Sequence, residues 1–258
     1  MIPQFTVRLI LGLTMIWSLL PRPLITSGYF RIQNLVVLGL SVLGFLTVDS
    51  WQQFVGESTI VSSGTTSGLL ILTAVIAFVA SVLWTLERRQ AATTTLFITL
   101  AMAMGLVVGM LPLVGRSPGM MVLTLGGELA AAISLGGGMG VMLLGHWYLT
   151  ATGMSLAPLS RGVTILQCAL FARLAFILLS LLIASPEVRT SLAETHFVYS
   201  LLRTCGLIGP LILIFLTRNT LRYRNTQSAT GVLFAMVILL FVGEAAGMLL
   251  SHDLQWPF

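Results

Sequence analysis

The sequence predicts an all-α fold, a polytopic bundle of about eight membrane-spanning helices. Of its 258 residues, 57% are apolar and 8% are charged, and the mean hydropathy is +1.01. Soluble domains of this size do not have such a composition. Several apolar runs approach or exceed the roughly 20 residues that cross about 30 Å of hydrocarbon as a helix. Because no linker or repeat divides the chain, we expect one integral membrane domain over residues 1–258.

Short polar breaks divide the apolar runs into eight expected helices, near residues 5–20, 32–48, 69–86, 94–114, 119–145, 162–184, 196–217 and 228–251. The first run is short and follows a weakly basic start, as in a signal peptide. No small-residue cleavage site follows it, and the chain continues Pro21-Arg22-Pro23. We therefore keep it as a spanning helix, with a shallow or kinked segment and a total of seven crossings as the alternative.

The second expected helix is followed by a polar connection over residues 49–68, in which Trp51 and Phe54 suit the membrane interface. We interpret this connection as a loop rather than a binding lid.

The third and fourth helices flank Arg88 and Arg89. The last three helices contain ionisable residues within apolar sequence.

The fifth helix is rich in glycine. Small residues recur at a spacing of four, as in Gly127/Ala131 and in Ala132/Gly136/Gly140, which allows a close approach of another backbone. We expect this helix inside the bundle, where it packs closely. A flexible helix beside a transported substrate is the alternative.

Arginine supplies all thirteen positive charges, and its distribution predicts the orientation. Eight arginines fall at alternate connections, whereas the other connections and the termini hold Arg8, Arg116 and Arg189. The positive-inside rule then places the basic connections in the cytoplasm and both termini outside, as in a bacterial inner membrane. Anionic lipid headgroups explain the net charge of +5 without a nucleic-acid partner.

Several kinds of site lack their sequence motifs. Cys168 and Cys205 lie in expected helices at different depths, which disfavours a disulfide. The chain has no Cys-x-x-Cys motif and no GxxxxGK[ST] loop, so iron–sulfur, structural zinc and nucleotide sites have no support. An ATP-driven pump in one chain is thereby excluded.

Histidine, tryptophan and tyrosine adjoin at the end of the fifth helix, in His146-Trp147-Tyr148. Such rings favour the headgroup region, so we interpret them as interfacial anchors rather than ligands. The other histidines, His196 and His252, lie at the opposite side of the membrane, where they are weak candidates for a metal or a haem. A b-type haem is disfavoured because it requires a second axial ligand at matching depth.

Four ionisable residues lie within the expected helices: Glu128, Arg173, Arg203 and Glu244. A charge within hydrocarbon costs at least about 2.5–3.5 kcal/mol unless it is paired or hydrated. Counting from the helix ends places all four at compatible levels in the outer half of the membrane. They form either two pairs, Arg203–Glu244 and Glu128–Arg173, or one network. Structural neutralisation and a functional polar cavity are both open interpretations.

The last two helices, with YSLLRTCGLIGPLILIF and VILLFVGEAAGMLL, resemble the end of membrane anchor subunits of the dimethyl sulfoxide reductase and polysulfide reductase type. The resemblance covers about sixty residues. The chain departs from it after Glu244, where the family commonly continues toward an arginine. The resemblance implies a haem-free or haem-poor anchor that exchanges electrons and protons with a quinone, together with iron–sulfur and catalytic subunits.

Two functions are therefore expected, from different classes. In the first, the chain is a membrane subunit of a respiratory-type redox complex and is not catalytic alone. Arg203 and Glu244 then line a quinone pocket, with Glu128 and Arg173 beside it. In the second, the chain is a secondary transporter or permease for a small polar or anionic solute, and the same charged residues bind that solute.

Overall fold

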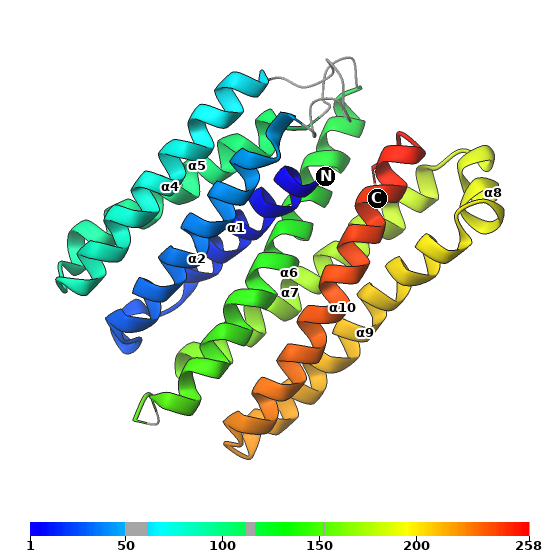
Figure 1. Ribbon diagram of the computed structural model, residues 1–258. Helices are drawn as coiled ribbons and strands as arrows, with labels where there is room; N and C mark the ends of the chain where they lie inside the picture. The colour runs from blue at the N-terminus through cyan, green and yellow to red at the C-terminus, as the bar shows by residue number, and fades with distance from the viewer. Residues whose placement is uncertain (50–60, 112–116, 152, 258) are drawn as a thin grey trace.

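The computed structural model is all-helical and describes residues 1–49, 61–111, 117–151 and 153–257 (Figure 1). Its described part contains eight helices that are long and apolar enough to cross a membrane. They are α1 (Ile2–Leu19), α2 (Ser27–Leu46), α4 (Ser63–Thr85), α5 (Arg89–Gly109), α6 (Pro118–Thr150), α7 (Ala157–Ile183), α9 (Phe197–Arg222) and α10 (Thr226–Asp253). The predicted class, a polytopic transmembrane bundle, is confirmed.

The first helix qualifies as a span, which supports eight crossings over seven. Within α1, 67% of the apolar window is buried. The helix ends before Pro21, and Leu20 adopts the extended conformation (φ −75°, ψ 151°) that a following proline favours. A short 3-10 helix, Arg22–Leu24, then leads to α2.

Most of the helices begin or end several residues away from their predicted bounds, as α4 and α6 illustrate. The helix α4 begins at Ser63 rather than near residue 69, because the Ser62 hydroxyl caps it by accepting a bond from the Thr65 amide at 3.3 Å. The predicted loop over residues 49–68 is therefore too long at its carboxyl end. Trp51 and Phe54 lie outside the described residues. The helix α6 extends past its predicted end at residue 145, through His146 to Thr150.

A short polar helix, α8 (Pro186–Glu194), was not predicted from the sequence. The Ser185 side chain caps it by accepting a hydrogen bond from the Val188 amide at 3.4 Å, and Glu187 lies in its first turn. With nine residues and no buried side chain, α8 carries no apolar pattern that a search for spans would detect. It lies at the same end of the bundle as both chain termini (Figure 1).

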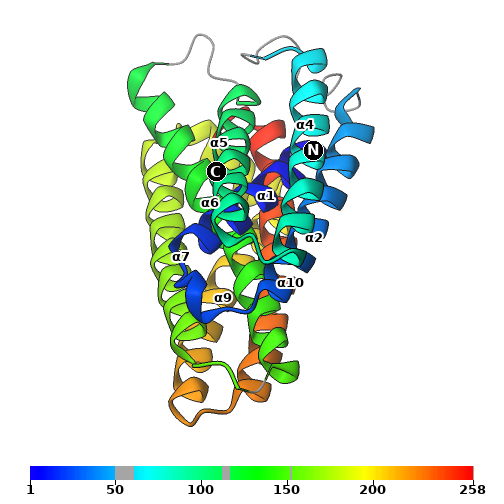
Figure 2. The same ribbon diagram turned by 90° about the vertical axis from the view of Figure 1, so that its left-hand side faces the viewer.

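The helices are arranged around α6. This helix contacts α1, α7 and α10, while α2, α4 and α5 lie on the far side of α1. The turned view shows most of the long helices running along a common direction, with α1 crossing them obliquely (Figure 2). The interior position predicted for the glycine-rich helix is confirmed, because 72% of the apolar window of α6 is buried.

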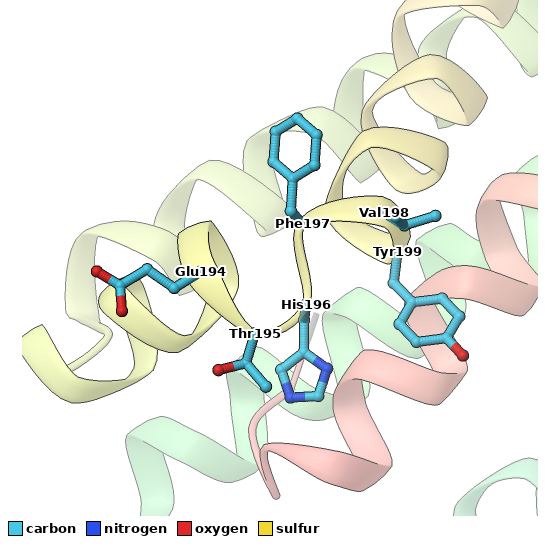
Figure 3. A pocket seen from close by; sticks show the side chains of 6 residues that line it. All are labelled: Glu194, Thr195, His196, Phe197, Val198 and Tyr199. Atoms are coloured by element: carbon cyan, nitrogen blue, oxygen red, sulfur yellow. The ribbon is translucent and has the colours of Figure 1, made fainter.

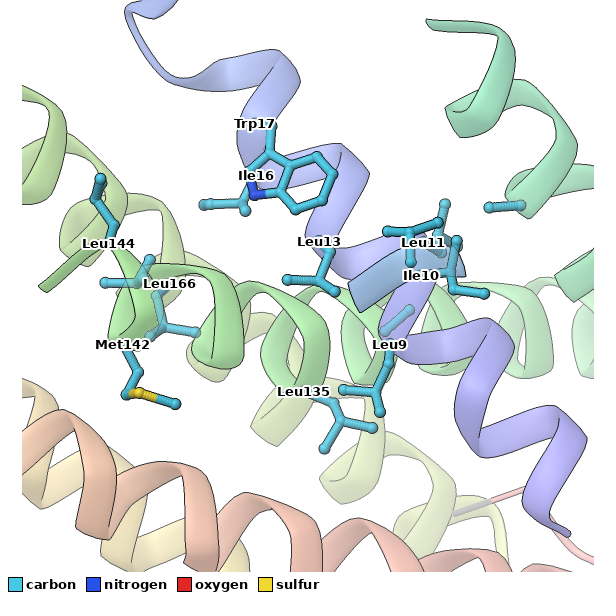
Figure 4. Packing of buried hydrophobic residues seen from close by; sticks show 14 of the residues in the cluster. Leu9, Ile10, Leu11, Leu13, Ile16, Trp17, Leu135, Met142, Leu144 and Leu166 are labelled. Atoms are coloured by element: carbon cyan, nitrogen blue, oxygen red, sulfur yellow. The ribbon is translucent and has the colours of Figure 1, made fainter. Parts of the chain in front are cut away.

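Glycine pairs allow two of the helix contacts to be unusually close. A Cβ at Gly12 of α1 would lie 1.9 Å from the carbonyl oxygen of Ala132 and 2.7 Å from the Cα of Gly136 in α6. A Cβ at Gly206 of α9 would similarly lie 2.3 Å from the Cα of Gly243 in α10. Around the first contact, leucine and isoleucine side chains of α1 pack with α6 in the buried core (Figure 4). Backbone approach of this kind stabilises helix pairs in lipid.

We expect the two connections over residues 87–93 and 218–227 to be protected from reagents added outside the cell. Both hold arginine clusters, which the positive-inside rule places in the cytoplasm. Single cysteines introduced there, in a variant lacking Cys168 and Cys205, should react with an impermeant maleimide only after the membrane is opened. A cysteine at Gln255, near the opposite end, is the matched control and should react in intact cells. Labelling of either basic connection in intact cells would reverse the orientation.

Candidate functional site

Five charged side chains from five helices meet inside the bundle. We call them the charge cluster: Arg8 of α1, Glu128 of α6, Arg173 of α7, Arg203 of α9 and Glu244 of α10. Each lies no more than ten residues from the helix end on the side of the chain termini, or about 15 Å at 1.5 Å per residue. The cluster is thus well inside the span but closer to that end.

Glu244 is the centre of the charge cluster and is 2% exposed. Arg173 contacts both of its carboxylate oxygens, with Nε to Oε1 at 3.0 Å and Nη2 to Oε2 at 3.1 Å. The Nη1 of Arg203 lies 2.8 Å from Oε1, and the Nη1 of Arg8 lies 3.6 Å from Oε2. The single negative charge of Glu244 is therefore shared among three guanidinium groups.

Glu128 pairs with Arg8 at the edge of the charge cluster. The Nε of Arg8 donates to Oε2 of Glu128 at 2.7 Å, and its Nη2 donates to Oε1. The side chain of Glu128 is 13% exposed, the most accessible of the five. The Nη1 of Arg173 also donates to the carbonyl oxygen of Gly127 at 3.1 Å, which links α7 to the helix that carries Glu128.

The structure brings the four predicted residues together as one network, the second of the two arrangements that the sequence left open. The expected contact between Arg203 and Glu244 is present. Glu128, expected beside Arg173, contacts Arg8 instead. Arg8 itself was missed because it was counted with the outer charges. Its position inside the apolar sequence of the first expected helix is the signal that could have identified it.

A glycine makes room for one of the arginines. A Cβ at Gly247 would lie 2.9 Å from both Cζ and Nε of Arg203. The close Gly206–Gly243 contact holds α9 and α10 together next to the cluster. The small residues of the last two helices therefore serve the packing of the charged side chains as well as the helix pair.

The charge cluster holds three arginines and two glutamates. Within the described part of the chain, the Nε and Nη2 of Arg203 are buried and have no hydrogen-bond partner. An unpaired buried donor costs about 1–3 kcal/mol, and more if it is charged. The site therefore carries surplus positive charge and unused hydrogen-bond donors in a surrounding of low dielectric.

The aromatic residues near the end of α6 make structural contacts. Trp147 donates from Nε1 to the Thr26 hydroxyl at 2.8 Å, and Tyr148 donates from its hydroxyl to the carbonyl oxygen of Ser155. These bonds join the end of α6 to the start of α2 and to the turn before α7. His146 is exposed. The contacts agree with an anchoring role for the aromatic pair.

Replacing Trp147 with phenylalanine should lower the free energy of unfolding by at least about 1 kcal/mol, because the hydrogen bond to Thr26 is lost and the smaller ring keeps only part of the contacts of the indole. Replacing the neighbouring His146 with alanine should change it by less than about 0.5 kcal/mol. Unfolding midpoints in detergent measure both. A larger loss for His146→Ala than for Trp147→Phe, or an absorbance band lost with it, would show that the histidine has the more important role.

The two other histidines lie at the end of the bundle with the chain termini. His196 lines a pocket of about 370 Å³ formed by Glu194–Tyr199, at the junction of α8 and α9 (Figure 3). His252 pairs through Nδ1 with Oδ1 of Asp253 at 3.0 Å. Cys168 and Cys205 are exposed free thiols. Among the described residues, no group of three or more His, Cys, Asp or Glu side chains is placed to hold a metal ion.

No protein family, no curated protein and no solved structure matches this chain. The charge cluster is therefore interpreted from its own geometry.

Proposed function

We propose that this chain is the membrane subunit of a redox complex and that the charge cluster binds the headgroup of a quinone. The observation that carries the proposal is the burial of five charged side chains around Glu244 in the bundle. Such groups are costly in lipid and are found mainly at substrate, ion and proton pathways. A buried ion network contributes little net stability in many proteins, since apolar packing of the same volume is often as favourable or more so.

The chemistry of the charge cluster suits a quinone headgroup. Ring carbonyl oxygens accept hydrogen bonds, and the Nε and Nη2 of Arg203 are donors without a partner among the described residues. The carboxylates of Glu128 and Glu244 are groups that can exchange protons when a quinone is reduced. Glu128, as the more accessible carboxylate, is the group we assign to exchange with water.

The proposed redox partners are iron–sulfur and catalytic subunits, in line with the resemblance of α9 and α10 to reductase anchors. In this proposal the chain supplies the membrane site for the quinone, and its partners supply the redox centres. The proposed location is the bacterial inner membrane, with the chain termini and the charge cluster toward the outer face.

Purification in a mild detergent tests the proposal. We expect iron–sulfur proteins to co-elute and about one quinone per chain to be extracted with solvent. Arg203→Gln should lower the quinone content severalfold, whereas Arg189→Gln, an exposed arginine of α8, should leave it unchanged. A protein that elutes alone and without quinone would refute the redox function.

A second function, a permease for a small anion, is favoured by the surplus positive charge of three arginines against two glutamates. In that case the purified protein alone, reconstituted in liposomes, should accelerate the uptake of a small carboxylate. Arg203→Gln should abolish this uptake. Uptake without any redox partner would favour the permease over the redox subunit.

A further inference from the structure

Two arginines of the charge cluster hold a carboxylate in the same way. Arg8 presents Nε and Nη2 to the two oxygens of Glu128, and Arg173 presents Nε and Nη2 to the two oxygens of Glu244. This side-on contact, with two parallel bonds, is the strongest that a guanidinium makes with a planar carboxylate.

Arg203 is bound differently. It contacts Glu244 through Nη1 alone, which lies 2.8 Å from Oε1 and also donates to the carbonyl oxygen of Gly243 at 3.2 Å. Its Nε and Nη2, the edge that the other two arginines turn to a carboxylate, are buried and unpaired among the described residues. The side chain is 8% exposed, so this edge has little access to bulk water.

The charges and the hydrogen bonds of the cluster therefore both indicate one missing carboxylate. Three arginines face two glutamates, and the arginine without a carboxylate on its Nε–Nη2 edge is Arg203. We propose that Arg203 binds a singly charged oxyanion on this edge, through two oxygens that share the charge. This inference rests on the proposed function in treating the charge cluster as the ligand site, and it goes beyond it: a quinone is uncharged, so the anion is a second ligand that competes with the quinone headgroup for this edge.

A pocket at the end of the bundle lies on the same side of α9 as Arg203. His196, Tyr199, Arg203 and Gly206 follow one another at helical spacing along one side of α9. Since Gly206 contacts Gly243, this side faces α10. The His196 and Tyr199 side chains point to the same side of the pocket, away from Phe197 (Figure 3). Tyr199, which lines the pocket on this face, is therefore about one helical turn from Arg203.

A small carboxylate and the phosphodiester of an anionic lipid share this chemistry, so both are tested. Benzoate is titrated calorimetrically into the intact protein in nanodiscs of zwitterionic lipid. If a free carboxylate is the ligand, we expect saturable binding that weakens at least tenfold in Arg203→Gln and is unchanged in Arg189→Gln. If a lipid is the ligand, phosphatidylglycerol should raise the unfolding midpoint of the wild-type protein but not that of Arg203→Gln, and it should compete with benzoate.

A glycine variant tests the position without removing a charge. Gly247→Ala places a methyl group 2.9 Å from Nε of Arg203, so the guanidinium must move and benzoate should bind at least tenfold more weakly. Gly231→Ala is the matched control in the same helix, because among the described residues no atom beyond the helix's own nearby backbone lies within 4 Å of its Cβ position. Unchanged affinity in Gly247→Ala would place the anion elsewhere and overturn the proposal.

Other outcomes separate this inference from the proposed function. If neither benzoate nor phosphatidylglycerol binds the wild-type protein, or if both bind Arg203→Gln equally well, the anion site is refuted. A protein that binds benzoate through Arg203 but purifies without quinone would keep the anion site and refute the quinone function. If the purified protein contains quinone and binds benzoate only after the quinone has been extracted, the anion site and the quinone function are both supported.

Discussion

Replacing Glu244 with leucine should destabilise the protein by about 3–5 kcal/mol, the range for breaking a buried ion pair. Glu244 lies within 3.6 Å of three guanidinium groups, so its loss leaves three arginines facing one glutamate. The variant should accumulate poorly in the membrane, and its unfolding midpoint in detergent should fall strongly.

The control for this change is Glu187→Leu. Glu187 is an exposed carboxylate in the first turn of α8, and its replacement should cost no more than about 1 kcal/mol through the helix dipole. Equal losses in the two variants would contradict the central position of Glu244. A smaller loss for Glu244→Leu than for a single arginine change would do the same.

Gly12→Ala is the second change with a large expected effect. Its methyl group would lie 1.9 Å from the carbonyl oxygen of Ala132, so α1 and α6 must separate. Overpacking of this kind costs about 1–3 kcal/mol or more, and the shift should weaken the Arg8–Glu128 pair. Unfolding in detergent, followed by circular dichroism, measures the loss.

The matched control is Gly39→Ala in α2, where no atom of the described chain other than the local helix backbone lies within 4 Å of the Cβ position. Alanine should be neutral there or stabilise the helix by about 0.5–1 kcal/mol, because glycine has the lower helix propensity. The two substitutions therefore have opposite expected signs. A Gly12→Ala protein as stable as wild type would show that the backbone contact between α1 and α6 is not needed.

The helices could be predicted from sequence because hydrocarbon thickness imposes a length on every apolar span. Boundaries set by local contacts could not. The Ser62 cap starts α4 earlier than hydropathy indicates, and α8 is too short and polar to have an apolar signature. The glycines of α6 indicated a close helix contact, but the sequence alone could not show that Gly136 faces Gly12 of α1.

The charge cluster was predictable in part. Arg203 and Glu244 lie on consecutive antiparallel helices, so counting residues from the helix ends was enough to align them. Arg8 contacts Glu128 across 120 residues of sequence, and no local pattern specifies that contact. Arg8 also changes the interpretation. The charges of the four predicted residues sum to zero, whereas the cluster with Arg8 carries a formal net charge of +1.

The unfolding midpoint of Arg203→Leu, without added ligand, tests most directly whether the surplus charge serves a ligand. The change leaves two arginines and two glutamates and removes the unpaired Nε and Nη2, while Glu244 keeps its contacts to Arg173 and Arg8. We expect a midpoint equal to or above that of the wild type, because replacing unpaired buried donors with apolar groups is neutral or favourable. A fall as large as that of Glu244→Leu would show that Arg203 is kept for the stability of the bundle, and would contradict a ligand site.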